Sequence, residues 1–439
     1  MASSLAAALD GLRLQPSSSD NSGNKKKMNL SAFGFLPAGI PGTPTPFTYH
    51  VPNRDVHRVN TLVSLADIGT PAWYNQNAYA PNGTFGVSRE WLADAQASWL
   101  DDFDWRQHEE RHNSVPNFKI NITTPSDGQL FDIHFAALFS KKADATPILL
   151  MHGWPGTWME FLPMMELLGE KYTPETLPYN VIVPSIPDYG LSTRRNEDRE
   201  LTMEVAAEAM NELMVQLGFN AYVAQGGDVG SFLAQHLSGS HEECKAFHLN
   251  MLFLNPTQTA AVANLSVTPE EQGRLGLAQA WASTGSAYAN EHGTRPSTLS
   301  LVLQTNPLAM LAWMGEKFIE WSDNRKPLSL DTILSMVSYY WYTKSYGRSL
   351  WAYRSLTRIV GGALPDQPIS LTKPFGFSAF PVEIATLPRS WADHLFPNLV
   401  FYGVQDEGGH FAALQVPEAF LKDIEEFVAI VKPNVTTSA

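Results

Sequence analysis

Residues 221–237, AYVAQGGDVGSFLAQHL, run from an apolar stretch through two glycines to one acidic residue and on into a helical pattern. Small residues stand two before, one before and two after Asp228, as they do at a nucleophile elbow, the sharp turn from a strand to a helix. Gly226, Gly227 and Gly230 allow the strained backbone and the close packing of such a turn. We therefore expect Asp228 to project from the carboxyl edge of a sheet, where open α/β folds bind ligands. The stretch alone equally allows Asp228 to act only as the cap of the following helix.

Strand, turn and helix signals alternate on both sides of this turn. The segments TPILLMHGWPG, YNVIVPSIPDYG and AFHLNMLFLNPT are short apolar runs broken by Gly or Pro, and amphipathic stretches such as TMEVAAEAMNELMVQLG separate them. This alternation predicts an α/β fold with a mostly parallel, doubly wound sheet. After Pro256 helical segments rich in Trp, Tyr and Met follow, and Thr268, Pro269 and Glu271 form a capping-box start. Strands resume with KPFGFSAFPVEI and PNLVFYGVQ, which makes the middle a helical insertion over the sheet.

These patterns divide the chain into five predicted segments. The first is rich in Ser, Asn and Lys and is predicted to be disordered, and the second mixes extended and helical patterns before two strand-like runs. The segments are a disordered tail (1–33), an N-terminal covering segment (34–140), the first part of the α/β core (141–260), a helical lid (261–358) and the second part of the core (359–439).

Composition limits the classes of function. The 439 residues are 44% hydrophobic and 17% charged, and no apolar run approaches the roughly 20 residues that cross a bilayer, so we expect a soluble protein. The N-terminus has neither a signal peptide pattern nor an anchor, which favours the cytoplasm. The net charge of −14 and a single basic cluster, Lys25 to Lys27, make nucleic acid an unsuitable partner. The lone Cys244 has no partner for an internal disulfide and reads as a buried structural thiol.

A histidine and an acid that would complete a catalytic triad follow the last strands. His410 lies in GGHFAAL after the strand-like NLVFYG, where the base of a triad is found in the chain order nucleophile, acid, base. The acid must come from Glu383, Asp393, Asp406 or Glu407. Glu383 is preferred because it stands just after its own strand. His410 and Glu383 each have a plainer alternative: the sequence equally allows a histidine that only hydrogen-bonds its own loop and a carboxylate that is solvated.

The segment LLMHGWPGTW supplies a second loop at the same edge of the sheet. A backbone N–H there, that of Trp154, together with the N–H of Val229 would form an oxyanion hole, whose donors must be fixed before charge develops. The Pro and Gly residues of this segment are equally typical of an ordinary tight turn.

An aspartate nucleophile implies a particular chemistry. A carboxylate attacks a saturated carbon by displacement and leaves an alkyl ester on the enzyme, which water activated by a histidine then hydrolyses. Either a haloalkane or an epoxide is a suitable substrate. An epoxide also needs an acid for its departing oxygen, and the insertion offers Tyr288 and Tyr353, although most of the 14 tyrosines must be packing residues.

The chain resembles the epoxide hydrolases of the α/β-hydrolase fold, in particular the microsomal type and its soluble fungal relatives. The resemblance rests on HGWPGTW, PSIPDYGLS, GGDVGS, GSAYANEHGTRPST, KPFGFSAFPVEI, PRSW and GGHFAAL in this order, and covers residues from about 45 to 430. It implies that Asp228 is the nucleophile, His410 the base, Glu383 the acid of the triad, and Tyr288 and Tyr353 the donors to the epoxide oxygen.

The resemblance further implies hydrolysis of an epoxide to a vicinal diol and a role in detoxification of xenobiotics. The expected partners are a small epoxide and water, with no cofactor, no metal and no membrane anchor, and the family also allows a homodimer. Val229 stands where the microsomal type has Trp and where haloalkane dehalogenases usually place a halide-binding Trp. This weakens the first alternative, a dehalogenase with the same ester intermediate. The second alternative is a non-catalytic binding protein of the same fold.

Overall fold

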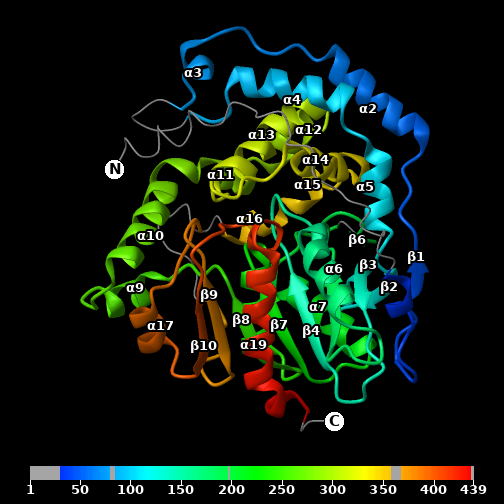
Figure 1. The fold of residues 1–439 in the computed structure, drawn as a ribbon, viewed down its shortest axis with the longest axis vertical. Helices are drawn as coiled ribbons and strands as arrows, with labels where there is room; N and C mark the ends of the chain where they lie inside the picture. The colour runs from blue at the N-terminus through cyan, green and yellow to red at the C-terminus, as the bar shows by residue number, and fades with distance from the viewer. Residues whose placement is uncertain (1–29, 80–84, 196–197, 357–366, 437–439) are drawn as a thin grey trace.

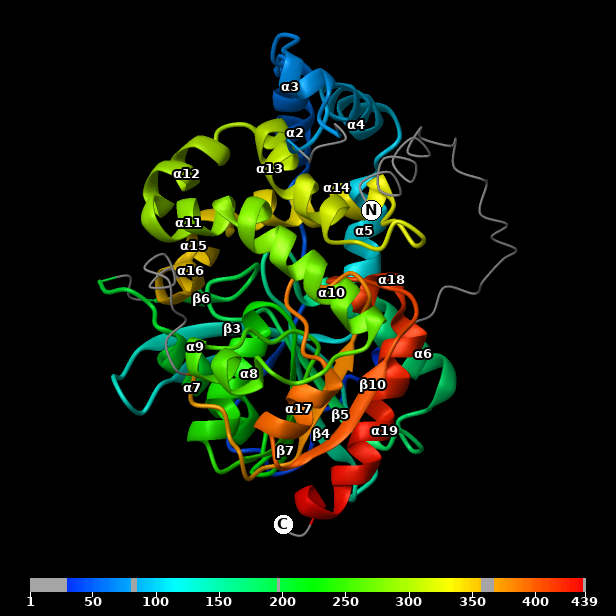
Figure 2. The same cartoon turned by 90° about the vertical axis from the view of Figure 1, so that its left-hand side faces the viewer.

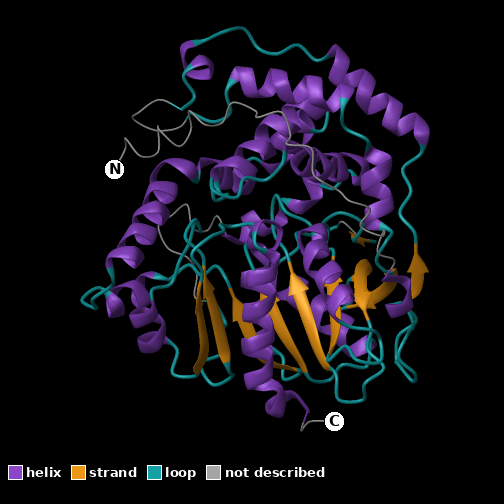
Figure 3. Cartoon of the chain, viewed as in Figure 1, coloured by secondary structure: helices purple, strands orange, loops and turns teal. Residues whose placement is uncertain are grey.

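The computed structural model describes residues 30–79, 85–195, 198–356 and 367–436. Within them the chain forms one ten-stranded sheet in the order β1-β2-β3-β5-β4-β7-β8-β9-β10, with β6 paired to β3 (Figures 1 and 3). Strands β4, β5 and β7 to β10 are parallel, whereas β1, β2, β3 and β6 join antiparallel. The strands are β1 (Thr45–Phe47), β2 (Asn117–Thr123), β3 (Leu130–Leu138), β4 (Thr146–Met151), β5 (Tyr179–Pro184), β6 (Thr193–Arg194), β7 (Tyr222–Gly226), β8 (Cys244–Leu249), β9 (Phe375–Ala379) and β10 (Leu399–Val404).

Helices cover both faces of the parallel part of the sheet, which confirms the predicted doubly wound α/β fold. One face carries α7 and α8, and the other carries α6 and α19 (Figure 2). Strands β4, β7 and β8 read as nearly continuous apolar runs because both of their faces are buried. The helices of the core are α6 (Leu162–Lys171), α7 (Met203–Gln216), α8 (Val229–Ser240), α17 (Arg389–Leu395), α18 (Ala412–Gln415) and α19 (Pro417–Thr436), with the 3-10 turn η2 (Trp158–Phe161) before α6.

A helical lid lies beyond the carboxyl ends of the parallel strands (Figure 1). Its α10 begins with the predicted capping box, in which Thr268 accepts from the N–H of Glu271 and the Glu271 carboxylate accepts from the N–H of Thr268. The lid elements are α9 (Pro256–Val262), α10 (Pro269–Ala280), the π-helix η3 (Trp281–Gly285), α11 (Ala287–Thr294), α12 (Pro296–Leu303), α13 (Pro307–Glu320), α14 (Leu330–Thr343), α15 (Tyr346–Ser349) and α16 (Trp351–Leu356).

The N-terminal segment wraps around the lid and then enters the sheet. Helices α2 and α4 pack on α13, α5 packs on α14, and the chain continues into β2 and β3 (Figure 1). Its elements are η1 (Leu30–Phe33), α2 (Asn53–Leu65), α3 (Trp73–Gln76), α4 (Arg89–Asp101) and α5 (Trp105–His112).

Ordered structure begins within the segment that the sequence predicts to be a disordered tail. Residues 1–29 of the predicted tail lie outside the described residues, as does the predicted lid boundary at residue 358. The remainder of that tail forms η1, where Leu30 and Phe33 are buried, so ordered packing begins before residue 34. Cys244 is buried at the start of β8, as predicted. None of the helices in the described ranges is long and apolar enough to cross a membrane.

Candidate active site

Asp228 lies in a tight turn between β7 and α8. Its backbone has φ 50° and ψ −126°, a region that costs free energy for any residue with a Cβ. A Cβ on Gly230 would collide with the backbone of Met151 on the neighbouring strand, so the helix approaches β4 more closely than a side chain permits. The Asp228 side chain makes no capping hydrogen bond to α8. The geometry is that of the predicted elbow, and the helix-cap alternative does not fit it.

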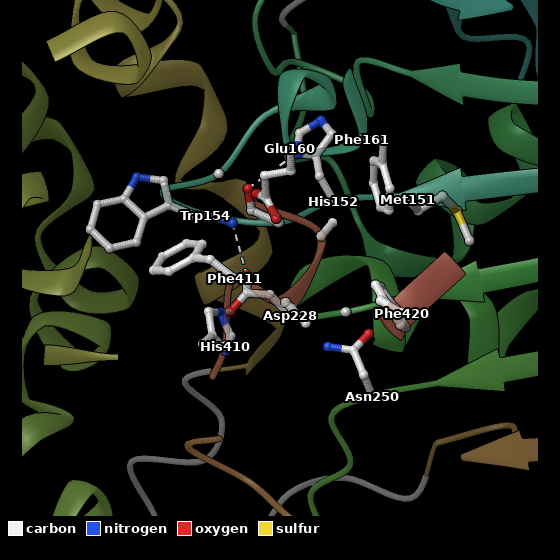
Figure 4. Close-up of a pocket in the computed structure, with 15 residues that line it drawn as sticks. Met151, His152, Trp154, Glu160, Phe161, Asp228, Asn250, His410, Phe411 and Phe420 are labelled. Carbon is white, nitrogen blue, oxygen red and sulfur yellow. Dashed lines mark hydrogen bonds and ion pairs between the residues drawn. The ribbon is translucent and has the colours of Figure 1, made fainter. Parts of the chain in front are cut away.

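The two carboxylate oxygens of Asp228 have different partners. Oδ1 accepts a hydrogen bond from the backbone N–H of Trp154 at 2.8 Å, and Oδ2 lies 3.3 Å from Nε2 of His410 (Figure 4). A Cβ on Gly153 would overlap this carboxylate, so the loop after β4 reaches Asp228 only because residue 153 is glycine. As the first residue of α8, Val229 has an N–H without an acceptor inside its helix.

His410 is held between Asp228 and Glu383. Its Nδ1 lies 2.8 Å from Oε1 of Glu383, and both side chains are almost fully buried, with 3% and 1% exposed. A bridge between Val382 and Gly409 joins the two loops that carry this pair. The backbone N–H of His410 also donates to the carbonyl of Trp321 in the lid, at 3.0 Å.

The other three acids that the sequence offered lie elsewhere. Asp393 pairs with Arg389 on the surface of α17, Glu407 pairs with Lys326, and Asp406 is exposed. Of the four candidates, Glu383 is the one that contacts His410.

The charges around His410 decide its protonation. Burial alone would lower the pKa of His410, but the negative charge of Glu383 and the hydrogen bonds with Asp228 and Glu383 outweigh burial and raise this pKa to about 10. The imidazole is therefore protonated at neutral pH. A reaction that neutralises Asp228 lowers the pKa of His410 and moves it toward the form that acts as a base.

Tyr288 on α11 and Tyr353 on α16 lie on the lid side of Asp228. Their rings are 5.7 Å apart at an angle of 78°, and the Tyr288 ring stacks on that of Trp154 at 5.3 Å. Burial and the charge of Asp228 raise the pKa of Tyr288 well above its ordinary value, and burial likewise raises the pKa of Tyr353. Both phenols therefore keep their protons. The two phenol groups also interact with each other through their hydroxyls.

Two cavities meet at Asp228. The larger, of about 260 Å³, carries Tyr288 and Tyr353, and the smaller, of about 20 Å³, carries His410 (Figure 4). The larger cavity is otherwise mainly apolar, and its walls include Phe232, Met251, Phe253, Trp281, Leu356 and Ile384.

The sequence analysis missed Glu160, whose carboxylate lines the smaller cavity. The signal for it in the sequence is its position on the loop after β4, six residues beyond Trp154. Within the described ranges, no group of three or more His, Cys, Asp or Glu side chains is arranged to hold a metal ion.

Comparisons with known proteins agree with this architecture. The family model described as "Epoxide hydrolase N terminus" matches residues 44–161, and the model described as "alpha/beta hydrolase fold" matches residues 146–346. The solved structure of Aspergillus niger epoxide hydrolase is 41% identical, with a TM-score of 0.83 over 91% of this chain and 99% of that one. A relative from Dothistroma septosporum is 40% identical over 401 residues, which are 91% of this chain and 93% of that protein.

More distant relatives extend the similarity. Epoxide hydrolase 1 of Sus scrofa is 29% identical over 79% of this chain and 82% of its own length. The N-terminal match and the match to the hydrolase core occur together in this chain. The chain therefore belongs to the epoxide hydrolases of the microsomal type, enzymes of the α/β-hydrolase fold that carry the epoxide hydrolase N-terminal segment.

Proposed function

We propose that this epoxide hydrolase opens its substrate with Asp228 and releases a vicinal diol in a second step driven by His410. The observation that carries the proposal is that the Asp228 carboxylate is shared by two cavities. Phenolic donors face it in one cavity, and a histidine paired with an acid faces it in the other. The two half-reactions of an ester mechanism need these two environments.

In the first half-reaction the epoxide occupies the larger cavity. An oxygen of Asp228 attacks one ring carbon, the bond from that carbon to the epoxide oxygen breaks, and a proton from Tyr288 or Tyr353 neutralises the departing oxygen. The raised pKa of each tyrosine keeps the phenol protonated and ready to donate. The apolar walls exclude water from the reacting carbon.

In the second half-reaction Asp228 is an uncharged ester. Loss of the negative charge of Asp228 lowers the pKa of His410, and its resting proton passes to the tyrosinate left by ring opening. The neutral imidazole then accepts a proton from water as that water attacks Cγ of Asp228. Negative charge develops on the ester carbonyl, which the N–H groups of Trp154 and Val229 stabilise. The bond from Cγ to the diol oxygen then breaks, His410 returns the proton to that oxygen, and Glu383 stabilises the imidazolium in between. The new carboxyl of Asp228 gives its remaining proton to His410, which restores the resting state.

Membership of the epoxide hydrolases decides against the two alternatives raised by the sequence, a dehalogenase and a non-catalytic binding protein. The short side chain of Val229 lies on the wall of the larger cavity and provides no N–H for a halide. Cytoplasmic location, a homodimer and a role in detoxification stay predictions from the sequence.

A single turnover in ¹⁸O water tests the mechanism. Enzyme in excess over styrene oxide, as the probe substrate, is expected to place the label in the Asp228 carboxylate and to release an unlabelled diol oxygen, because the first diol takes its oxygen from the protein. Peptide mass spectrometry locates the label. Label in the diol on the first turnover would mean that water attacks the epoxide directly, and would overturn the proposal.

A further inference from the structure

Glu160 belongs to η2, the turn that follows the Trp154 loop, and none of the steps above uses it. It lines the cavity of about 20 Å³ together with Asp228 and His410, and in Figure 4 its side chain and that of His410 approach Asp228 from different sides. A Cβ on Gly156 would overlap the Glu160 carboxylate. Glycine at position 156 therefore leaves the space into which this carboxylate extends.

The size and position of this cavity suit a single reactant. A volume of about 20 Å³ is enough for one water molecule, which needs two or more polar partners to be held in place. Because Trp154 holds Oδ1 of Asp228 and His410 lies beside Oδ2, water that attacks Cγ with the help of His410 must come from the cavity that His410 lines. The Glu160 carboxylate lines that cavity too.

The charge of Glu160 is coupled to that of Asp228. Burial is the main cause that raises the pKa of Glu160 to about 8; the charge of Asp228 adds to it and the imidazolium of His410 opposes it. When the ester forms and His410 loses its proton, the charge of Asp228 and the imidazolium, which act on this pKa in opposite directions, are both removed, whereas the burial of Glu160 is unchanged.

A plainer role for Glu160 is to cap η2. Thr157 is the N-cap of this turn, its hydroxyl accepts from the N–H of Met159, and the carboxylate of Glu160 interacts with the backbone of Thr157. One acceptor oxygen is enough for that contact, and an amide oxygen provides it equally well. Capping therefore does not explain a carboxylate on the wall of this cavity.

We propose that Glu160 is a positioning residue that holds the hydrolytic water against the Asp228 ester. One carboxylate oxygen contacts the backbone of Thr157 and the other accepts a hydrogen bond from one O–H of the water, so a glutamine that keeps the first contact turns its NH2 toward the water. His410 takes the other proton as the water oxygen bonds to Cγ. No proton is transferred to Glu160, and the bond from Cγ to the diol oxygen breaks as described above. This inference rests on the ester mechanism of the proposed function.

The test separates formation of the ester from its hydrolysis. Full-length wild type and the Glu160→Gln variant are mixed with styrene oxide, quenched at successive times and analysed by intact-protein mass spectrometry. We expect ester formation to stay within about 2-fold of wild type and ester hydrolysis to slow on the order of 10- to 100-fold, the loss typical of a misplaced reactant. Ester should therefore accumulate in the variant.

Two controls isolate this role. Thr157→Val removes the capping hydroxyl but leaves the carboxylate, and Glu166→Gln removes a surface carboxylate that pairs with Arg111 on α5. Both are expected to keep the wild-type ratio of the two rates.

The outcomes distinguish this inference from the mechanism on which it rests. Wild-type protein that never gains the mass of the substrate would contradict the ester mechanism itself. An ester that forms in Glu160→Gln and is hydrolysed at the wild-type rate would overturn only the role of Glu160. Equal slowing in Thr157→Val would assign Glu160 to the cap. Normal ester formation in the variant shows by itself that the site is folded.

Discussion

At the scale of single residues, the position of Asp228 explains why its neighbours are small. The backbone is strained, with φ 50°, and the loop after β4 passes so close that Gly153 has no room for a Cβ. The strain fixes the carboxylate between the Trp154 N–H and His410, so little reorganisation is needed when charge develops. Packing around this residue therefore maintains a geometry that the isolated turn would not adopt.

The two tyrosines are expected to act in ring opening alone. Replacing either Tyr288 or Tyr353 with Phe should slow formation of the Asp228 ester about 10-fold or more, and replacing both should slow it about 100-fold or more, within the range for loss of a general acid. Rapid-quench mass spectrometry under single-turnover conditions measures this rate. Tyr346→Phe is the matched control, because Tyr346 is a buried lid tyrosine whose hydroxyl is hydrogen-bonded to His292 and does not line the larger cavity. Wild-type ester formation in the double variant would show that other groups protonate the epoxide.

The charge of Glu383 should appear in the pH dependence of stability. The pKa of His410 is raised from 6.5 to about 10 in the folded protein, so its pairing stabilises the fold fully below pH 6.5 and is lost as pH rises through 10. Glu383→Gln removes the main favourable charge. The free energy of unfolding, measured in urea at pH 6.5 and pH 10, is expected to fall less with pH in this variant than in wild type.

A surface carboxylate on the neighbouring helix serves as the control for that experiment. Asp393→Asn should leave the wild-type pH dependence unchanged, since Asp393 is half exposed and its ion-pair partner is Arg389 rather than His410. The same pH dependence in Glu383→Gln and wild type would mean that Glu383 does not hold the proton on His410.

Some residues of the site could be predicted from the sequence pattern, and others could not. Asp228, His410 and Glu383 could be singled out because each follows a strand at the same edge of the sheet. Tyr288 and Tyr353 could not be chosen from 14 tyrosines by pattern, since the lid folds back over the site by contacts between distant segments, and only family resemblance identified them. Glu160 looks like an ordinary helix-start acid until the cavity beside it is known.

At the scale of elements, the sequence predicted best where local chemistry and packing agree. The capping box at the start of α10 is formed by Thr268 and Glu271, which are three residues apart in the sequence. None of the residues of α10 is buried, so the start of this helix does not depend on tertiary packing. The strands β1 and β6 are too short to show a period, and their pairing is set by β2 and β3. The π-helix Trp281–Gly285 continues directly from α10, so the apolar pattern gives no sign of its wider turn.

At the scale of the whole molecule, the N-terminal segment, the lid and the core form one connected structure around the site. Tyr49 packs edge-on against Tyr339 of the lid, whose hydroxyl accepts from the indole N–H of Trp158. Tyr340 next to it donates to the carbonyl of Gly156, on the loop that holds Asp228. These contacts join segments that are far apart in the chain. Composition and periodicity therefore predicted a covering segment, but not that it packs on the lid residues that contact the loop beside Asp228.

The connection predicts that loosening the N-terminal segment destabilises the entire chain. The Glu109 carboxylate accepts from the N–H of Val51 at 2.6 Å and from the indole N–H of Trp105 at 3.3 Å, so Glu109→Ala leaves two buried donors without this acceptor and should cost about 1–3 kcal/mol. Because β2 and β3 continue this segment into the central sheet, we expect the variant to unfold in a single transition whose midpoint lies at a lower urea concentration than in wild type. Fluorescence and residual activity, measured across the same urea series, should report the same midpoint. Asp94→Ala on the exposed side of α4 should shift it by less than about 0.5 kcal/mol. Proteolysis of Glu109→Ala within residues 34–112 that leaves activity intact would instead mean that this segment unfolds separately from the catalytic core.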